Sequence, residues 1–241
     1  MAAGHAWAAT LRQHYRRFAG VPIESDLRPY RRLLARIDAA GAHECSDARL
    51  RARFDELRRE AATGQPLDAL LPNAYAVIRE VCARTIGMRP FDVQVMAAIA
   101  LHQGKLAQLA TGEGKTLVAV MPAALNALAG RGVHVLTAND YLAGRDASWM
   151  GPAYAFLGLR AAAVTSRLDR PGRQSAYGAD ITYVTAKEAG FDFLRDHTVS
   201  EPSLVVQRPF HYAIVDEADF ILIDEARVPL VIAGESDTPE V

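Results

Sequence analysis

A stretch with two glycines, Ala110 to Thr116, has the residue types that bind phosphate. It follows a short apolar run and opens a longer one, which predicts the order strand, loop and helix that a phosphate-binding loop requires. Gly112 and Gly114 permit backbone conformations that let successive N–H groups surround an anion. Lys115 would contact the β- and γ-phosphates of a nucleotide, and the Thr116 hydroxyl would ligate Mg²⁺. The alternative is a glycine-rich turn that only begins a helix.

Two adjacent carboxylates, Asp216 and Glu217, form a second candidate centre after the apolar run from Tyr212 to Val215. Asp216 would hold Mg²⁺ through water, and Glu217 would orient and deprotonate the attacking water in nucleotide hydrolysis. Burying two carboxylates is costly unless a cation or hydrogen-bond donors meet them. The alternative is a surface acidic cluster at the start of a helix. The presence of both motifs in one chain favours a nucleotide-hydrolysis site.

The composition is that of a globular protein. Of 241 residues, 50% are hydrophobic and 23% are charged. No apolar run reaches the roughly 18 residues needed to span a bilayer, and the start of the chain lacks a secretory signal pattern. Cys45 and Cys82 have no metal-ligand spacing, so we expect reduced thiols in a cytoplasmic protein.

The net charge of −1 conceals an asymmetry between the two parts of the chain. Residues 1–90 contain 15 Arg, no Lys and 10 acidic residues, whereas residues 91–241 contain 12 basic and 18 acidic residues. The basic part could meet nucleic acid, anionic lipid or an acidic protein surface. The equally open alternative is a set of solvated helix faces.

Helices are expected in the first part of the chain and alternating strands and helices in the second. Apolar spacing predicts helices over 10–18, 29–37, from a cap at Ser46 to Gly64, and over 74–86. Pro72 is read as the break before the last of these. From residue 88 onward, helices are predicted over 92–102, 115–129, 141–157 and 187–195, and strands over 105–109, 133–138, 160–164, 180–184 and 211–215.

This alternation predicts an α/β fold, with a parallel sheet and helices on both faces. In such sheets ligands bind at the carboxyl ends of the strands. Both candidate centres are therefore expected at the same edge of the sheet.

From residue 46 to residue 234 the chain resembles the first nucleotide-binding domain of the SecA family, the motor ATPases of bacterial preprotein translocation. The similar segments are 87–94, 111–116, 132–135, 139–143, 145–146, 190–192, 194–196 and 221–230. Leu109 stands where a strict phosphate loop has its first glycine, a departure that helicase-like families allow. Pro90 stands where the SecA family usually has histidine. Residues 1–44 are longer than the usual short N-terminal helix and do not match it closely.

The resemblance implies a RecA-like fold of the superfamily-two class and assigns a role to each matching residue. Adenine contact falls to Met88, Phe91 and Gln94, and phosphate contact to Thr111, Gly112, Glu113, Gly114, Lys115 and Thr116. The metal ligands would be Thr116 and Asp216, and the catalytic residues Lys115 and Glu217. The expected cofactors are ATP and Mg²⁺.

The resemblance also implies a division of the chain and a set of partners. A helical N-terminal arm would cover 1–86, an incomplete nucleotide-binding domain 87–235, and the start of a missing preprotein-binding insertion 236–241. The expected partners are a preprotein substrate and the SecYEG translocon, at the cytoplasmic face of the membrane. Anionic lipid and a second copy of the chain are further candidates, and nucleic acid is disfavoured.

Two other functions are open. The sequence Asp-Glu-Ala-Asp at 216–219 suggests an RNA helicase, but such a helicase should carry Pro-Thr-Arg-Glu-Leu after the strand at 133–138. This chain has Asn139, Asp140, Tyr141 and Leu142 there. The other alternative is a truncated paralogue that binds a nucleotide without turnover.

Overall fold

Four parallel strands form the sheet of the computed structural model, which describes residues 26–231. Their order is β2–β3–β1–β4. The strands are β1 (Val133–Thr137), β2 (Ala161–Ala163), β3 (Ile181–Thr185) and β4 (Tyr212–Val215). Val133 of β1 lies opposite Ile181 on one side and Tyr212 on the other. Each predicted strand from residue 133 onward is present, with ends shifted by no more than two residues.

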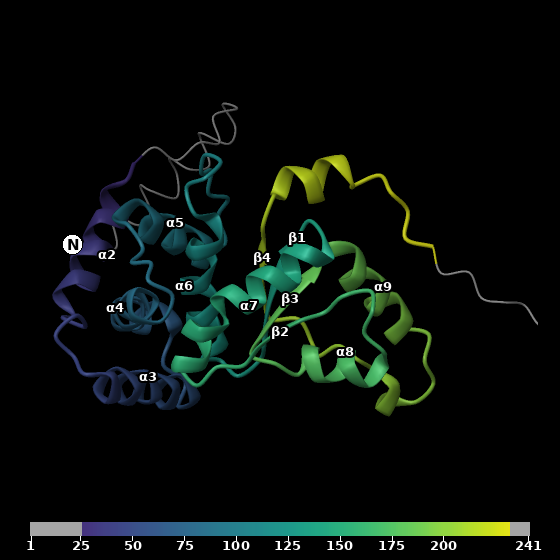
Figure 1. Ribbon diagram of the computed structural model, residues 1–241, viewed down its shortest axis with the longest axis horizontal. Coiled ribbons are helices and arrows are strands. Elements are labelled where there is room, and N and C mark those ends of the chain that lie inside the picture. The colour runs from purple at the N-terminus through teal and green to yellow at the C-terminus, as the bar shows by residue number, and fades with distance from the viewer. Residues whose placement is uncertain (1–25, 232–241) are drawn as a thin grey trace, which may run out of the picture.

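Helices cover both faces of this sheet, which confirms the predicted α/β fold (Figure 1). On the face toward the N-terminal helices lie α6 (Lys115–Ala127) and α7 (Asp140–Phe156). On the other side lie α8 (Arg170–Tyr177) and α9 (Ala186–Asp196). Strands β1 and β3 are almost wholly buried, as expected for the central strands of a parallel sheet.

The N-terminal helices pack directly on the α/β part. They are α2 (Arg28–Ala39), α3 (Asp47–Ala62), α4 (Leu67–Thr85) and α5 (Asp92–His102). Helix α4 contacts α2, α3, α6 and α7, and most of its residues are buried. One hydrophobic core therefore runs from Tyr30 to Ile214. The division at residue 86 remains a prediction, and the core is continuous across it.

Three sequence-based expectations need correction. Helix α4 begins at Leu67 and continues through Pro72, because burial of Leu70 and Leu71 holds its first turn against the core. Helix α8 was not predicted, because Pro171 and Gly172 lie in its first turn and Asp169 supplies the cap. The predicted helix over 10–18 and the segment 236–241 lie outside the described residues.

The predicted strand over 105–109 is the third correction. Residues 105–110 alternate between half-buried and exposed, as in a strand, but within 26–231 they pair with no other strand. A strand needs hydrogen bonds from a neighbour, and within 26–231 none of the four strands of the sheet pairs with this segment.

Two short helical elements complete the chain: η1 (Pro202–Leu204) and η2 (Phe220–Asp224), the latter with π-type hydrogen bonding. Cys45 and Cys82 are not joined to each other. Between residues 26 and 231, none of the helices combines the length and the apolar character that crossing a membrane requires.

Candidate nucleotide-binding site

The loop before α6 is built to present backbone N–H groups. Gly112 has φ +87° and Gly114 has φ +73°, both in the left-handed region that favours glycine. Gly114 is the N-cap of α6, and no side chain of the described residues caps this helix. The Leu117 N–H donates to the Gly114 carbonyl at 3.0 Å, whereas the N–H groups of Lys115 and Thr116 and the positive end of the helix dipole remain available for an anion. Thr111 to Gly114 are exposed, and Lys115 and Thr116 are half-buried in the first turn.

Gln94 lies between the loop and the segment before α5. Its side-chain oxygen accepts a hydrogen bond from the Phe91 N–H at 2.8 Å, and its Nε2 donates to the Glu113 carbonyl at 2.8 Å. A Cβ on Gly114 would lie 2.6 Å from Gln94 Nε2, so this approach also requires glycine. The side chain that the sequence assigned to adenine is thus a link between two parts of the site.

The other two residues of this segment differ in exposure. The Phe91 ring is 72% exposed, so it has a face available for stacking. Met88 is half-buried and packs against the core.

The acidic pair lies at the carboxyl end of β4. The Asp216 N–H continues the sheet by donating to the Leu136 carbonyl of β1 at 2.9 Å. Glu217 has φ +55°, a left-handed conformation that is uncommon for a residue other than glycine. Its N–H donates to Asp216 Oδ1 at 3.2 Å. Residues held in such sparsely populated backbone conformations cluster at functional sites.

Lys115 and Glu217, about one hundred residues apart in the sequence, lie together. Lys115 Nζ is 3.5 Å from Glu217 Oε1, and both side chains are partly exposed. An ion pair of this exposure contributes little to stability. Phosphate oxygens could therefore replace the carboxylate as the partner of Lys115 at small cost.

Asp216 lies in an unfavourable environment for a charge. Burial raises the pKa of its carboxyl above the usual value, and the nearby Glu217 and Asp146 carboxylates raise it further. Lys115 and the Glu217 N–H oppose this effect. Asp146 belongs to a segment that resembles the SecA family, but no role in the site was assigned to it from the sequence; it is buried on α7 and paired with Arg145 at 2.7 Å.

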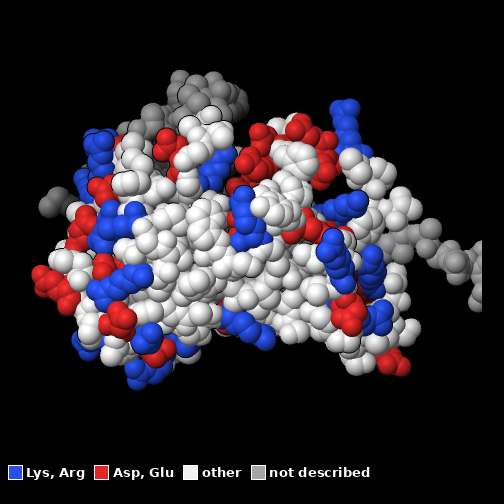
Figure 2. All heavy atoms as spheres, in the orientation of Figure 1, with Lys and Arg blue, Asp and Glu red and all other residues white. Residues whose placement is uncertain are grey.

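The surroundings of Asp216 and Glu217 are strongly acidic. In Figure 2 acidic side chains gather over the segment that follows β4. Glu217, Asp219, Asp224 and Glu225 of this segment are exposed. Within residues 26–231 no group of three or more His, Cys, Asp or Glu side chains is arranged to hold a metal ion by itself. Mg²⁺ commonly uses one or two carboxylates with water and phosphate oxygens, so the set Thr116 and Asp216 fits it chemically.

The sheet, the glycine loop and the acidic pair after β4 define the class of protein: a RecA-like α/β domain of the superfamily-two type. A family model described as the SecA DEAD-like domain matches residues 15–241. The chain belongs to this family. The resemblance seen in the sequence is thereby confirmed.

Several relatives are named protein translocase subunit SecA. The one from Rubrobacter xylanophilus is 61% identical over 189 residues, which cover 78% of this chain and 21% of the relative. Those from Carboxydothermus hydrogenoformans and Coxiella burnetii are each 53% identical over 220 residues. These matches cover 89% and 90% of this chain, and 25% and 24% of the relatives. The chain thus spans about a quarter of the length of these relatives.

Proposed function

We propose that this chain binds Mg-ATP and forms the first nucleotide-binding domain of a SecA-type motor. In the whole motor, ATP hydrolysis would be coupled to export of a preprotein across the cytoplasmic membrane. The observation that carries the proposal is the proximity of Lys115 and Glu217, because it unites the phosphate loop with the acidic pair. Family membership supports nucleotide use.

On the phosphate side, the N–H groups of Thr111, Gly112 and Gly114 would surround the β-phosphate. Lys115 would leave Glu217 and contact the β- and γ-phosphates. Glu217 would then be released to hold the attacking water and take its proton. The left-handed backbone of Glu217 supports this role, since residues in such conformations cluster at active sites.

Magnesium, when bound, would neutralise charge on the phosphates. The Thr116 hydroxyl and Asp216 would hold it, the latter through water. The raised pKa of Asp216 supports this role, because a cation would offset the burial and the carboxylate neighbours that disfavour its charge.

On the base side, Met88, Phe91 and Gln94 would contact adenine. The exposed Phe91 ring is suited to stacking on the base. Binding of the base would also affect the phosphate loop through Gln94, because its side-chain amide bonds both the Phe91 N–H and the Glu113 carbonyl.

The wider function rests on the resemblance to the SecA family, is supported by relatives named protein translocase subunit SecA, and is equally a proposal. The substrate would be a preprotein, and the partner the SecYEG translocon at the inner face of the membrane. Anionic lipid or a second copy of the chain would be additional partners. The RNA helicase alternative is disfavoured, because the relatives at 51–61% identity are named as SecA translocase subunits.

Calorimetric titration with Mg-ADP tests the proposal. We expect Lys115→Ala to weaken binding by about 10- to 100-fold, because one charge-assisted contact of about 1.5–3 kcal/mol is lost. Lys187→Ala is the matched control, since it removes the same charge from an exposed position on α9. Equal affinities for Lys115→Ala and the parent chain would reject the assignment of the loop.

A further inference from the structure

A buried arginine of α4 lies behind the segment proposed to contact adenine. The Arg79 side chain is only 11% exposed and makes three contacts through three different nitrogens. Its Nε donates to the Pro90 carbonyl at 2.8 Å, and its terminal nitrogens contact Asp92 at 2.6 Å and Asp38 at 3.0 Å. The guanidinium therefore joins α2, α4 and the two residues that flank Phe91.

The segment from Gly87 to Phe91 depends on these contacts. It contains no helix or strand, so no ladder of backbone hydrogen bonds fixes it. Glu80, the next residue of α4, contacts Arg89 at 2.6 Å. Helix α4 thus holds the segment at Arg89, at Pro90 and at Asp92, on both sides of the exposed Phe91 ring.

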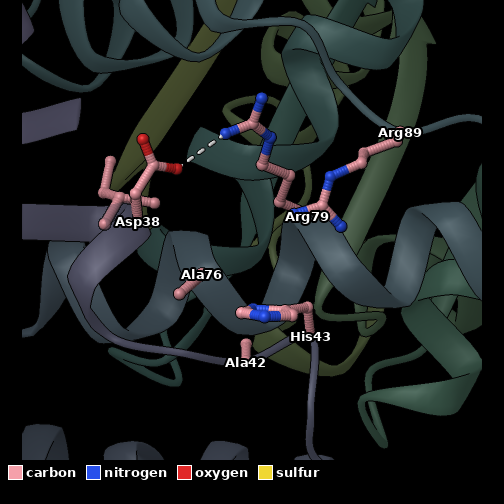
Figure 3. Close-up of a pocket in the computed structure, with 7 residues that line it drawn as sticks. Asp38, Ala42, His43, Ala76, Arg79 and Arg89 are labelled. Carbon is pink, nitrogen blue, oxygen red and sulfur yellow. Dashed lines mark hydrogen bonds and ion pairs between the residues drawn. The ribbon is translucent and has the colours of Figure 1, made fainter. Parts of the chain in front are cut away.

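The hydrogen bonds of Arg79 are made at the edge of a pocket. This pocket of about 420 Å³ is bordered also by Asp38, His43 and Arg89 (Figure 3). In Figure 3 the guanidinium extends toward Asp38 beside this space. A planar guanidinium with donors in a fixed fork can hold three acceptors in a set geometry, which an ammonium group cannot do.

The contacts continue to the phosphate loop. The Phe91 N–H bonds Gln94, and Gln94 bonds the Glu113 carbonyl. Arg79 therefore fixes one end of a chain of contacts whose other end is the loop. The phosphate-binding groups are held by α6, and the hydrogen bonds of Arg79 are made to other parts of the chain. Loss of Arg79 should therefore weaken contact with the base more than contact with the phosphates.

We propose that Arg79 is a positioning residue for the nucleobase: it holds the segment 87–91 so that Met88 and Phe91 can meet adenine. This inference rests on the proposed nucleotide binding. Arg79 would affect the affinity for the base, whereas the affinity for the phosphates would depend on the loop.

The test compares a ligand that has the base with one that lacks it. Mg-ADP and Mg-tripolyphosphate are titrated into the purified chain and into the variants Arg79→Lys and Asp92→Ala. We expect both variants to bind Mg-ADP about five- to tenfold more weakly, because one or more charge-assisted hydrogen bonds to the segment are lost. Their affinity for Mg-tripolyphosphate should stay within about twofold of the parent.

A matched control comes from another acidic residue that pairs with α4. Asp47 is the first residue of α3 and pairs with Arg84 of α4 at 2.8 Å, as Asp92 is the first residue of α5 and pairs with Arg79. The Asp47 and Asp92 side chains are 57% and 62% exposed. We expect Asp47→Ala to leave the affinity for both ligands unchanged.

Each result has one meaning. Unchanged Mg-ADP affinity in Asp92→Ala and Arg79→Lys overturns the inference, as does an equal loss for both ligands. If Arg79→Lys does not fold, the Asp92→Ala variant alone tests the inference, because the Asp92 side chain is exposed and its removal should not prevent folding. Failure of the parent chain to bind either ligand, or full binding by Lys115→Ala, instead rejects the proposed function.

Discussion

At the scale of single residues, Gly114 carries two constraints that separate variants can distinguish. Its φ of +73° disfavours any side chain, and Gln94 occupies the space where a Cβ would lie. Gly104 has a similar φ of +69°, but a Cβ added there would have nothing within 4 Å. The two glycines thus share the backbone constraint and differ in the steric one.

We expect Gly114→Ala and Gly104→Ala each to lower the free energy of unfolding by about 1–2 kcal/mol, the cost of a left-handed residue with a side chain. Only Gly114→Ala should also weaken Mg-ADP binding, because it displaces Gln94 from Glu113. Thermal unfolding and calorimetric titration of both variants measure the two effects. Equal Mg-ADP affinities in the two variants would show that the Gln94 contact has no part in binding.

Asp216 is expected to reduce the stability of the chain without nucleotide. Its folded pKa lies above the unfolded value, so the ionised form is disfavoured in the folded state. The stability associated with the protonated carboxyl is present below the unfolded pKa and is lost as the pH rises through the folded pKa. At neutral pH the charge therefore opposes folding.

We expect Asp216→Asn to raise the midpoint of thermal unfolding at pH 7.5 without nucleotide. The gain should shrink as the pH is lowered toward the raised pKa of Asp216, because the parent then becomes neutral at this position too. Asp219→Asn, at an exposed position of the same segment, is the control and should change little. A lower midpoint for Asp216→Asn at pH 7.5 would contradict this account of the charge.

At the scale of elements, α8 and α9 are joined by a buried ionic network. Arg173 of α8 contacts Asp192 and Glu188 of α9, each at 2.7 Å. The Asp192 side chain is 2% exposed and also accepts a hydrogen bond from Tyr177 at 2.9 Å. Arg195 approaches the same carboxylate from the exposed side at 3.0 Å.

Removing the buried arginine should cost far more than removing the exposed one. We expect Arg173→Met to lower the free energy of unfolding by about 3 kcal/mol, because Asp192 keeps its charge in a buried place with fewer partners. Arg195→Met should cost at most about 1 kcal/mol, since its side chain is 50% exposed. Urea denaturation of both variants checks this difference, and equal losses would mean that burial does not decide the cost.

At the scale of the whole molecule, we predict slow hydrolysis by the isolated chain, although it has the loop and the acidic pair. A superfamily-two motor binds its nucleotide between two RecA-like domains, and an arginine from the second domain is worth roughly 10³–10⁵ in rate. The candidate arginines belong to the same chain as the loop, and two of them are paired with carboxylates. Arg145 pairs with Asp146, Arg195 pairs with Asp192, and Arg227 is exposed beyond η2.

Steady-state phosphate release by the purified chain measures this prediction. We expect a turnover far below about 1 s⁻¹, the low end of ordinary enzyme rates. Phosphate release by the Lys115→Ala variant measures the background rate that does not come from this site. A turnover near that value, absent in Lys115→Ala, would mean that the chain completes its own catalytic site.

Much of this organisation was predictable from local sequence. The phosphate loop is a contiguous motif whose glycines, lysine and threonine act at fixed spacing, so no distant residue is needed to recognise it. The strands from residue 133 onward are short apolar runs between helical patterns, and Ser46 caps α3 as its residue type predicts. Family membership likewise followed from these motifs.

Tertiary structure decided the features that depend on partners distant in sequence. Helix α4 continues through Pro72 because the core holds Leu70 and Leu71, and residues 105–110 remain unpaired because strand pairing needs a neighbouring strand. The environment of Asp216 depends on Asp146 from another element, and the contacts of Arg79 join residues 38, 90 and 92. Local spacing shows none of these contacts, because burial and hydrogen bonding between distant residues arise only when the chain is folded.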